Sequence, residues 1–173
     1  MLPKLTFIVG GAASGKSRLA ESLAENHGST KIYLASAHIY DEEMATKVDL
    51  HKNRRKTGWK TIEAPLEAAE VLSTVQGDVV LFDCATLWLS NHMLSDSSDL
   101  RAEQDALFAA LRACKVPVIV VSNEVGEGIV PDNALARQFR EAQGRLNIEL
   151  AAVADLVIKV SVGLPQVLKG IMP

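Results

Sequence analysis

The architecture of this chain follows from one short segment near its start, Gly10-Gly11-Ala12-Ala13-Ser14-Gly15-Lys16-Ser17. The segment fits G-x-x-x-x-G-K-[ST], the pattern of a phosphate-binding loop. It follows an apolar run, Leu5–Val9, and leads into a helix-like stretch, Arg18–Ala24. In such a turn, successive backbone N–H groups can point at one anion, and the start of the helix adds partial positive charge. The sequence therefore predicts a site for a nucleoside triphosphate, against the alternative of a turn that binds nothing.

Three side chains near this segment suit the chemistry of a triphosphate. Lys16 is expected to reach the β- and γ-phosphates, and the Ser17 hydroxyl is expected to ligate Mg²⁺. Asp83 ends another apolar run, and a carboxylate in that position is the usual magnesium-side partner of a phosphate loop. We therefore expect Mg²⁺ between Ser17 and Asp83. The alternative for Asp83 is a helix cap or a structural loop carboxylate.

Length and charge limit the classes of protein to consider. With 173 residues, a single domain spanning 1–173 is expected. A formal net charge of -3 argues against nucleic-acid binding. The apolar runs are too short for a signal peptide or a membrane span, so we expect a cytoplasmic protein without membrane insertion. Cys84 and Cys114 lie in or beside apolar runs and are expected to be buried free thiols.

Short apolar runs alternate with helical patterns along the chain. The runs are Leu5–Val9, Lys31–Ala35, Val79–Cys84, Val116–Ser122 and Leu156–Val162. They are rich in Val, Ile and Leu without polar alternation, which is typical of strands covered on both faces. Helices are expected after Pro65, taken as a first-turn proline, near Asp99, and from about Asn133. This order predicts an α/β fold with a mainly parallel sheet and ligands at the carboxyl ends of its strands.

The end of the fourth predicted strand carries a second polar segment, residues 122–131. Glu124 is a candidate base for a substrate hydroxyl, because it would face the same cleft as Ser17 and Asp83. Gly126 and Gly128 are expected to need positive φ or a close approach of the backbone. The alternative is a structural turn before the long helix.

Residues 41–60 open with acidic side chains and end with a dense basic group. This charge order is typical of a solvated helix whose charges match its dipole. On such a helix His51 shares a face with Met44 and Val48, so it is either a core histidine or a histidine that faces the site. The neighbouring cations Lys52, Arg54 and Arg55 favour a phosphate-facing patch.

The remaining histidines, His27, His38 and His92, show no ligand spacing and are interpreted as surface or loop residues. Trp59 and Trp88 are expected to serve packing rather than base stacking.

Several segments together resemble one known family. Besides the phosphate loop they are Tyr33–Ala37, Asp41–Met44, His51–Arg55, Trp59–Glu63, Leu81–Cys84, Leu87–Asn91, Ser122–Pro131, Ala136–Asn147 and Gly163–Pro165. In these segments the chain resembles the bifunctional adenosylcobinamide kinase/adenosylcobinamide-phosphate guanylyltransferases of cobalamin biosynthesis. The resemblance covers nearly the whole chain, and the segments around His51 and Asn123 are specific to this family among phosphate-loop proteins.

The resemblance implies a RecA-like fold with helices on both faces of the sheet, a homotrimer, and two reactions. The first transfers a phosphoryl group from ATP or GTP to adenosylcobinamide. The second joins GMP from GTP to adenosylcobinamide phosphate through a covalent GMP-histidine, with His51 as the matching residue. The implied nucleotide contacts are Gly10, Gly11, Ala12, Ala13, Ser14, Gly15, Lys16, Ser17, Ala35, Ser36, Ala37, Lys52, Asn53, Arg54, Arg55, Glu63 and Asp83.

The chain departs from the family pattern at two positions. Many relatives carry Arg where Ala13 stands and Pro where Lys56 stands, which bears on nucleotide preference rather than on the reaction class. Competing hypotheses are a simple phosphate-loop kinase without guanylyl transfer and a nucleotide-gated interaction module. The sequence leaves open whether ATP or GTP feeds the kinase step, whether Glu124 or Asp83 is its base, and where the corrinoid binds.

Overall fold

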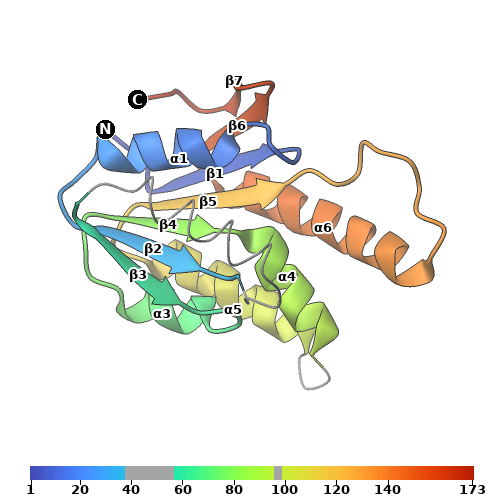
Figure 1. Cartoon of the computed structure of the whole chain (residues 1–173). Coiled ribbons are helices and arrows are strands. Elements are labelled where there is room, and N and C mark those ends of the chain that lie inside the picture. The colour runs from blue at the N-terminus through green and yellow to red at the C-terminus, as the bar shows by residue number, and fades with distance from the viewer. Residues whose placement is uncertain (38–56, 96–98) are drawn as a thin grey trace.

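The computed structural model describes residues 1–37, 57–95 and 99–173, which form a seven-stranded sheet with the order β3-β2-β4-β5-β1-β6-β7 (Figure 1). Neighbouring strands are parallel except β6 and β7, which are antiparallel. The strands are β1 (Leu5–Gly10), β2 (Lys31–Ala35), β3 (Trp59–Glu63), β4 (Val79–Asp83), β5 (Val118–Asn123), β6 (Leu156–Ser161) and β7 (Leu164–Lys169). The described helices are α1 (Lys16–Glu25), α3 (Ala68–Thr74), α4 (Ala85–Leu94), α5 (Leu100–Ala113) and α6 (Ala134–Val153).

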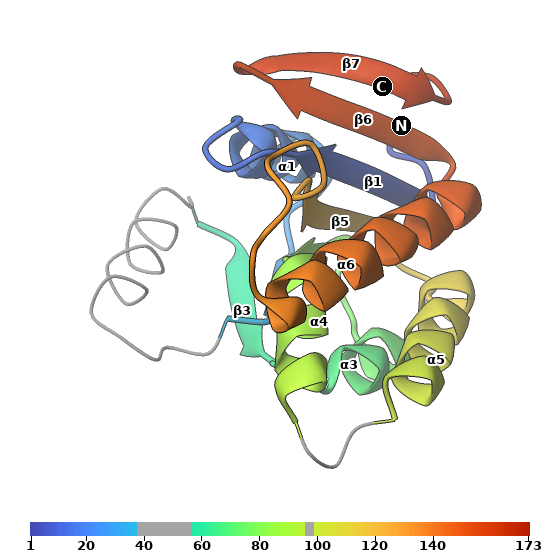
Figure 2. The same ribbon diagram turned by 90° about the vertical axis from the view of Figure 1, so that its right-hand side faces the viewer.

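Helices cover both faces of the sheet, as the resemblance implies (Figure 2). On one face, Ala20 of α1 belongs to the same apolar cluster as Ile119 of β5. On the other face, Leu146 of α6 belongs to a second cluster with Val120. Successive residues of β5 therefore face opposite layers, as the pleat of a strand requires. This alternation fixes which side chains at the end of β5 face α1 and which face α6.

The five predicted strands correspond to β1, β2, β4, β5 and β6. Strands β3 and β7 were not predicted from the sequence, because their side chains are largely exposed and follow no continuous apolar run. Helix α4 was not predicted either, because it is apolar on most sides and its sequence resembles a buried strand more than an amphipathic helix. The mainly parallel α/β fold is confirmed.

The prediction for Pro65 is wrong. Helix α3 begins only at Ala68, and Glu67 stands at its N-cap position. The segment before the helix is held by α4 instead, because Asn91 Nδ2 donates to the Pro65 carbonyl at 3.0 Å and Trp88 Nε1 donates to the Leu66 carbonyl at 3.1 Å.

The interpretation of His92 as a surface or loop residue is also wrong. This residue lies on α4 and is only 3% exposed. Its ring packs edge-on against Trp88, with 4.5 Å between the ring centroids. Burial on an apolar helix, which the single sequence does not reveal, accounts for the difference.

The other packing predictions hold where the structure describes the residues. Cys84 and Cys114 are buried free thiols. Trp88 is buried, and Trp59 packs edge-on to Tyr33 while its Nε1 donates to Glu25 Oε1 at 2.8 Å. Over the described ranges, no helix combines the length and the apolar character that crossing a bilayer requires.

Candidate nucleotide-binding site

The predicted phosphate loop connects β1 to α1 with a tightly fixed backbone. A Cβ on Gly10 would lie 2.5 Å from the Val160 carbonyl oxygen and 2.6 Å from Ser14 Oγ, so only glycine fits there. Gly15, at the N-cap of α1, has φ +95, a conformation that suits glycine. The loop therefore presents its backbone and the start of α1 to the carboxyl edge of the sheet, which is the geometry of an anion site.

Lys16 is the buried cation of this loop, with a relative exposure of 8%. Its Nζ donates to the Gly11 carbonyl at 3.0 Å and so lies across the loop. Burial lowers the pKa of Lys16 below its usual value, while the nearby Asp83 and Cys84 oppose that shift. A partly desolvated ammonium group next to a carboxylate is suited to bind the terminal phosphates of a triphosphate.

Several of the predicted nucleotide contacts lie on neighbouring strands, at the carboxyl edge of the sheet. Ala35 lies opposite Glu63 of β3 on one side and opposite Asp83 of β4 on the other. Ser36 Oγ donates to the Cys84 carbonyl at 2.7 Å and accepts from the Cys84 N–H at 2.8 Å. The ends of β2 and β4 are thus joined through one side chain, and the predicted residues of this edge lie together.

Asp83 is held in place by a neighbour on β2. Tyr33 Oη donates to Asp83 Oδ2 at 2.9 Å. The next residue, Cys84, takes no part as a thiolate, because burial and the Asp83 charge raise its pKa to about 12. The carboxylate of Asp83 and the hydroxyl of Ser17 offer oxygen ligands, which Mg²⁺ prefers alongside phosphate and water oxygens.

The hairpin between β6 and β7 supports the phosphate loop from the other side. The Gly163 N–H donates to the Ser14 carbonyl at 2.9 Å. A Cβ on Gly15 would lie 3.3 Å from the Gly163 Cα, so the two turns pack closely. The last strands of the chain therefore help to set the shape of a loop formed near its start.

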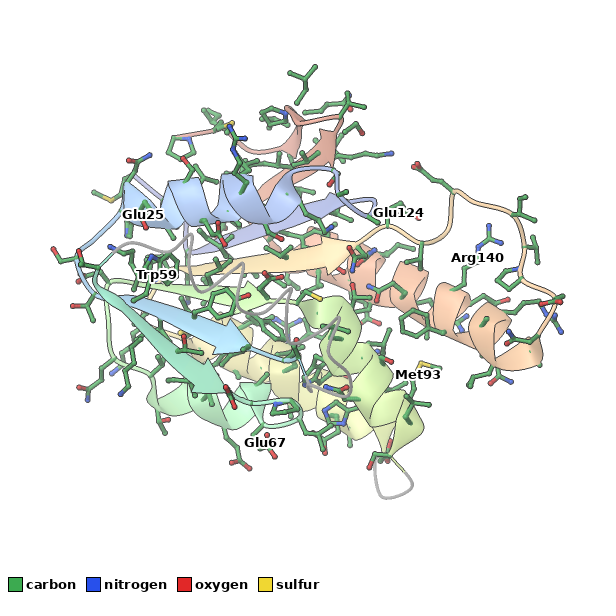
Figure 3. The ribbon with its side chains drawn as sticks, in the orientation of Figure 1. Glu25, Trp59, Glu67, Met93, Glu124 and Arg140 are labelled. Atoms are coloured by element: carbon green, nitrogen blue, oxygen red, sulfur yellow. The ribbon has the colours of Figure 1, made fainter. Side chains whose placement is uncertain are left out.

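The loop after β5 departs from the sequence prediction. Neither Gly126 nor Gly128 has positive φ, and a Cβ on Gly128 would meet no atom within 4 Å, so the expected need for glycine is wrong at Gly128. The segment is tied down instead by Arg140 of α6, which donates to the Gly126 and Gly128 carbonyls. Glu124 lies at the end of β5 beside the phosphate loop, and its N–H donates to the Gly10 carbonyl at 3.0 Å (Figure 3).

The basic segment lies outside the described residues. This applies to the predicted nucleophile His51 and to Lys52, Asn53, Arg54 and Arg55, as well as to His38. Their roles stay predictions. Among the described residues, no group of three or more His, Cys, Asp or Glu side chains could hold a metal ion.

The described geometry is that of a phosphate-loop nucleotide site, and the comparison with known families decides which one. Residues 6–168 match the family described as cobinamide kinase / cobinamide phosphate guanyltransferase. The chain belongs to this family. The match makes the chain an enzyme with two activities on cobinamide, a kinase and a guanyltransferase.

Similar proteins share this assignment. The chain is 41% identical over 166 residues to a bifunctional adenosylcobalamin biosynthesis protein, CobP, of Pseudomonas aeruginosa, covering 94% of this chain and 96% of that protein. It is 36% identical over 169 residues to the bifunctional adenosylcobalamin biosynthesis protein CobU of Escherichia coli K12, covering 88% and 93%.

Solved structures confirm the RecA-like phosphate-loop architecture of this cobinamide kinase / guanyltransferase. The RadB recombinase superposes with a TM-score of 0.52 at 17% identity, covering 91% of this chain and 74% of that one. An ATPase from a type III secretion system of pathogenic bacteria superposes with a TM-score of 0.54 at 13% identity, covering 96% and 57%. At these identities the likeness shows the fold alone.

Several side chains that support this site of the cobinamide kinase / guanyltransferase were not predicted from the sequence. Tyr33, Asn91 and Asn147 all bond to its strand ends, and none was proposed as a site residue. One signal was available for α6: Gln143 and Asn147 are polar residues at i and i+4 beside the apolar Leu146 and Leu150. A polar pair next to a buried helical stripe indicates a buried polar partner.

Proposed function

We propose that the chain phosphorylates adenosylcobinamide with ATP or GTP and then transfers GMP from GTP to adenosylcobinamide phosphate. The product is adenosyl-GDP-cobinamide, so the enzyme would act in cobalamin biosynthesis. The observation that carries this proposal is the phosphate loop with its buried Lys16 near Asp83, in a chain that belongs to the kinase/guanyltransferase family.

In the kinase step the described residues supply positioning and charge. Backbone N–H groups of the loop and the Lys16 ammonium would hold the triphosphate. Ser17 and Asp83 would hold Mg²⁺, whose charge offsets that of the phosphates when it is bound. The γ-phosphorus bond to the β-phosphate oxygen breaks, and a new bond forms to the acceptor hydroxyl, which loses its proton. Glu124 and Asp83 both lie at the carboxyl edge of the sheet, so either carboxylate could accept the proton of the acceptor hydroxyl.

In the guanylyl step we propose His51 as the nucleophile. A neutral imidazole nitrogen attacks the α-phosphorus of GTP, the bond to the β-phosphate oxygen breaks, and pyrophosphate leaves. An oxygen of adenosylcobinamide phosphate then displaces the imidazole and takes the GMP group. Imidazole is largely neutral near pH 7, which suits this role. Lys52, Arg54 and Arg55 would stabilise the charge on the α-phosphate and on the departing pyrophosphate.

The deciding experiment is incubation with Mg²⁺ and GTP labelled at the α-phosphate, followed by mapping of the labelled residue. We expect an acid-labile, alkali-stable label on His51. His51→Ala should abolish both the label and guanylyl transfer, while phosphorylation of adenosylcobinamide with ATP continues. His27→Ala is the matched control, since His27 follows α1 in a turn away from the phosphate loop, and it should label normally.

Other results would reject parts of this assignment. Full labelling of His51→Ala would exclude His51 as the nucleophile. An acid-stable adduct, or phosphorylation without any pyrophosphate release from GTP, would favour a simple kinase. Tight nucleotide binding without acceptor-dependent turnover would favour a nucleotide-gated interaction module.

We also propose that residues 1–173 work as one domain and assemble as a homotrimer. The seven strands share one sheet, which supports the single domain. Light scattering that gives the mass of three chains would support the trimer, and the mass of one or two chains would reject it.

A further inference from the structure

The end of β5 is held by a closed ring of hydrogen bonds that the two activities do not by themselves explain. Strand β4 pairs with β5 only as far as Asp83 and Val121, and the chain then turns into α4. The backbone N–H and C=O of Asn123 bond instead to side chains on two helices. Those side chains replace the partner strand at the point where β5 reaches the nucleotide site.

The ring has four hydrogen bonds, and each member donates to the next: Asn123 to Thr86, Thr86 to Ser122, Ser122 to Asn147, and Asn147 back to Asn123. The Asn123 N–H donates to Thr86 Oγ1 at 2.8 Å, and Asn147 Nδ2 donates to the Asn123 carbonyl at 3.1 Å. Ser122 Oγ donates to Asn147 Oδ1 at 2.7 Å. Because that bond uses the Ser122 proton, the 3.3 Å contact between Thr86 Oγ1 and Ser122 Oγ places Thr86 as its donor. Within the ring, each hydroxyl therefore donates one bond and accepts one from the preceding member.

Burial makes this ring rigid. Thr86 is 6% exposed, and Ser122 and Gln143 are 0% exposed. Gln143 Nε2 donates to both Ser122 Oγ and Asn147 Oδ1 at 2.9 Å, which supports the ring from α6. Buried hydrogen bonds in sequence strengthen one another, and a broken link leaves a desolvated polar group. The peptide of Asn123 consequently has little freedom.

The ring determines where the Asn123 side chain points. Ser122 bonds to α4 and α6, so the next side chain along the strand lies on the opposite face. That is the face of α1, which Val121 also shares. Sheet order places β5 between β4 and β1, and Asn123 lies opposite Gly10 in the register. The Asn123 amide therefore lies between the phosphate loop and the strand that ends in Asp83.

We propose that Asn123 is a catalytic residue of phosphoryl transfer and that Thr86, Ser122 and Asn147 are its positioning residues. The inference rests on the proposed kinase activity. The Asn123 amide would donate to an oxygen of the phosphoryl group while that group passes from the β-phosphate oxygen to the acceptor oxygen. The amide neither gains nor loses a proton. Its N–H groups stabilise charge that is largest in the transition state, so they act on kcat more than on nucleotide binding.

The first test removes the proposed catalytic amide of Asn123 and the positioning hydroxyl of Thr86 in separate variants, with adenosylcobinamide and ATP as substrates. Asn123→Ala should lower kcat by about 10²-fold, the usual cost of one lost donor to a transition state, with KM for ATP changed by less than about threefold. Thr86→Val removes the acceptor of the Asn123 N–H at nearly constant volume and should lower kcat by about tenfold. Thr86→Ser restores the hydroxyl and should recover most of the activity.

The second test combines the variants. If the ring acts through Asn123, then Thr86→Val should lower kcat no further in a chain that already carries Asn123→Ala. Multiplied effects in the double variant would overturn the proposal, as would a Thr86→Val chain whose ATP affinity falls while kcat stays normal. Thr74→Val on α3 is the matched control, because Thr74 is exposed and its hydroxyl donates to carbonyls of its own helix.

A third variant keeps the proposal falsifiable if Thr86→Val does not fold. Asn147→Asp keeps the shape but replaces the Nδ2 donor with an oxygen that faces the Asn123 carbonyl. The introduced carboxyl can donate again when it is protonated, so kcat relative to the unaltered chain should recover as pH falls. A constant ratio across pH, with folding intact by thermal unfolding, would overturn the positioning role. Failure of the unaltered chain to phosphorylate adenosylcobinamide would instead reject the proposed function.

Discussion

Two glycine-containing loops meet at the carboxyl edge of the sheet, and they are built in different ways. In the phosphate loop, a Cβ on Gly10 would lie 2.5 Å from the Val160 carbonyl oxygen, and Gly15 has φ +95. In the loop after β5, Gly128 has open space around it. That second loop is held by the side chain of Arg140 on α6, which donates to the Gly126 and Gly128 carbonyls (Figure 3).

The difference shows which parts of the two loops have a constrained backbone conformation. The phosphate loop is constrained at Gly10 by close contacts with Val160 and Ser14 and at Gly15 by its φ of +95, which helps to fix the backbone of an anion site made of N–H groups. The second loop is constrained at its root, where the ring fixes the Asn123 peptide, and only weakly beyond it. Gly10 and Gly15 of the phosphate loop therefore have a physical reason to be glycine, whereas Gly128 of the second loop has none in the described conformation.

The largest effect expected from breaking the phosphate loop is that of Lys16→Ala. Removing this buried cation should lower both phosphoryl and guanylyl transfer by at least about 10²–10³-fold, because it binds charge that develops on the phosphates. Both activities should be measured on the same preparation, with folding checked by thermal unfolding. Loss of one activity alone would mean that the two reactions do not share this loop.

Alanine substitutions at two glycines test the comparison directly. Gly10→Ala adds a methyl group against the Val160 carbonyl oxygen and Ser14 Oγ, and overpacking of this kind costs about 1–3 kcal/mol. We expect at least about a tenfold loss of GTP affinity. Gly128→Ala should change GTP affinity by less than about twofold, since the site is open. Calorimetric titration measures both, and equal losses would contradict the contrast between the loops.

Two lysines beside these loops, Lys16 at the start of α1 and Lys159 on β6, differ in their surroundings, which gives a prediction for pH dependence. Burial lowers the pKa of Lys16, whereas Glu127 raises the pKa of Lys159. Lys16 must be charged to bind phosphates, so kcat/KM for ATP should fall on an alkaline limb below the usual lysine value of 10.5. Lys159→Gln should leave that limb in place. A limb at 10.5 or above would show that Lys16 does not control it.

The smallest effect is expected from Arg140→Ala, which removes the bonds to the Gly126 and Gly128 carbonyls. These are surface contacts, so the loss should be below about 1 kcal/mol, or about 2–4 °C in Tm. Arg145→Ala, which removes an exposed ion pair with Glu141, serves as the control. A large loss of activity in Arg140→Ala alone would show that the second loop needs a fixed shape beyond its root.

The sequence predicted those parts of the molecule that depend on residues adjacent in the chain. The phosphate loop is a contiguous motif, and the central strands are continuous apolar runs because both of their faces are buried. Strands β3 and β7 escaped prediction because their exposed side chains carry no such pattern. His92 was misplaced because its burial depends on the packing of α4 against the Leu66 segment.

The supporting side chains of the site escaped prediction for a different reason. Thr86, Ser122 and Asn147 come from three elements and meet only when the sheet and both helices are assembled. Each is an ordinary polar residue in its own segment. The roles of His51 and the cations around it rest on the family resemblance and stay predictions.

The contact between Gly163 and Ser14 has a practical consequence for shortened or fused chains. A chain shortened before the β6–β7 hairpin would keep the complete phosphate-loop motif. It would lack the turn that packs against the loop at Ser14 and helps to set its backbone conformation. Val162, 89% exposed in that same turn, is accessible for the attachment of a fluorophore close to the phosphate loop.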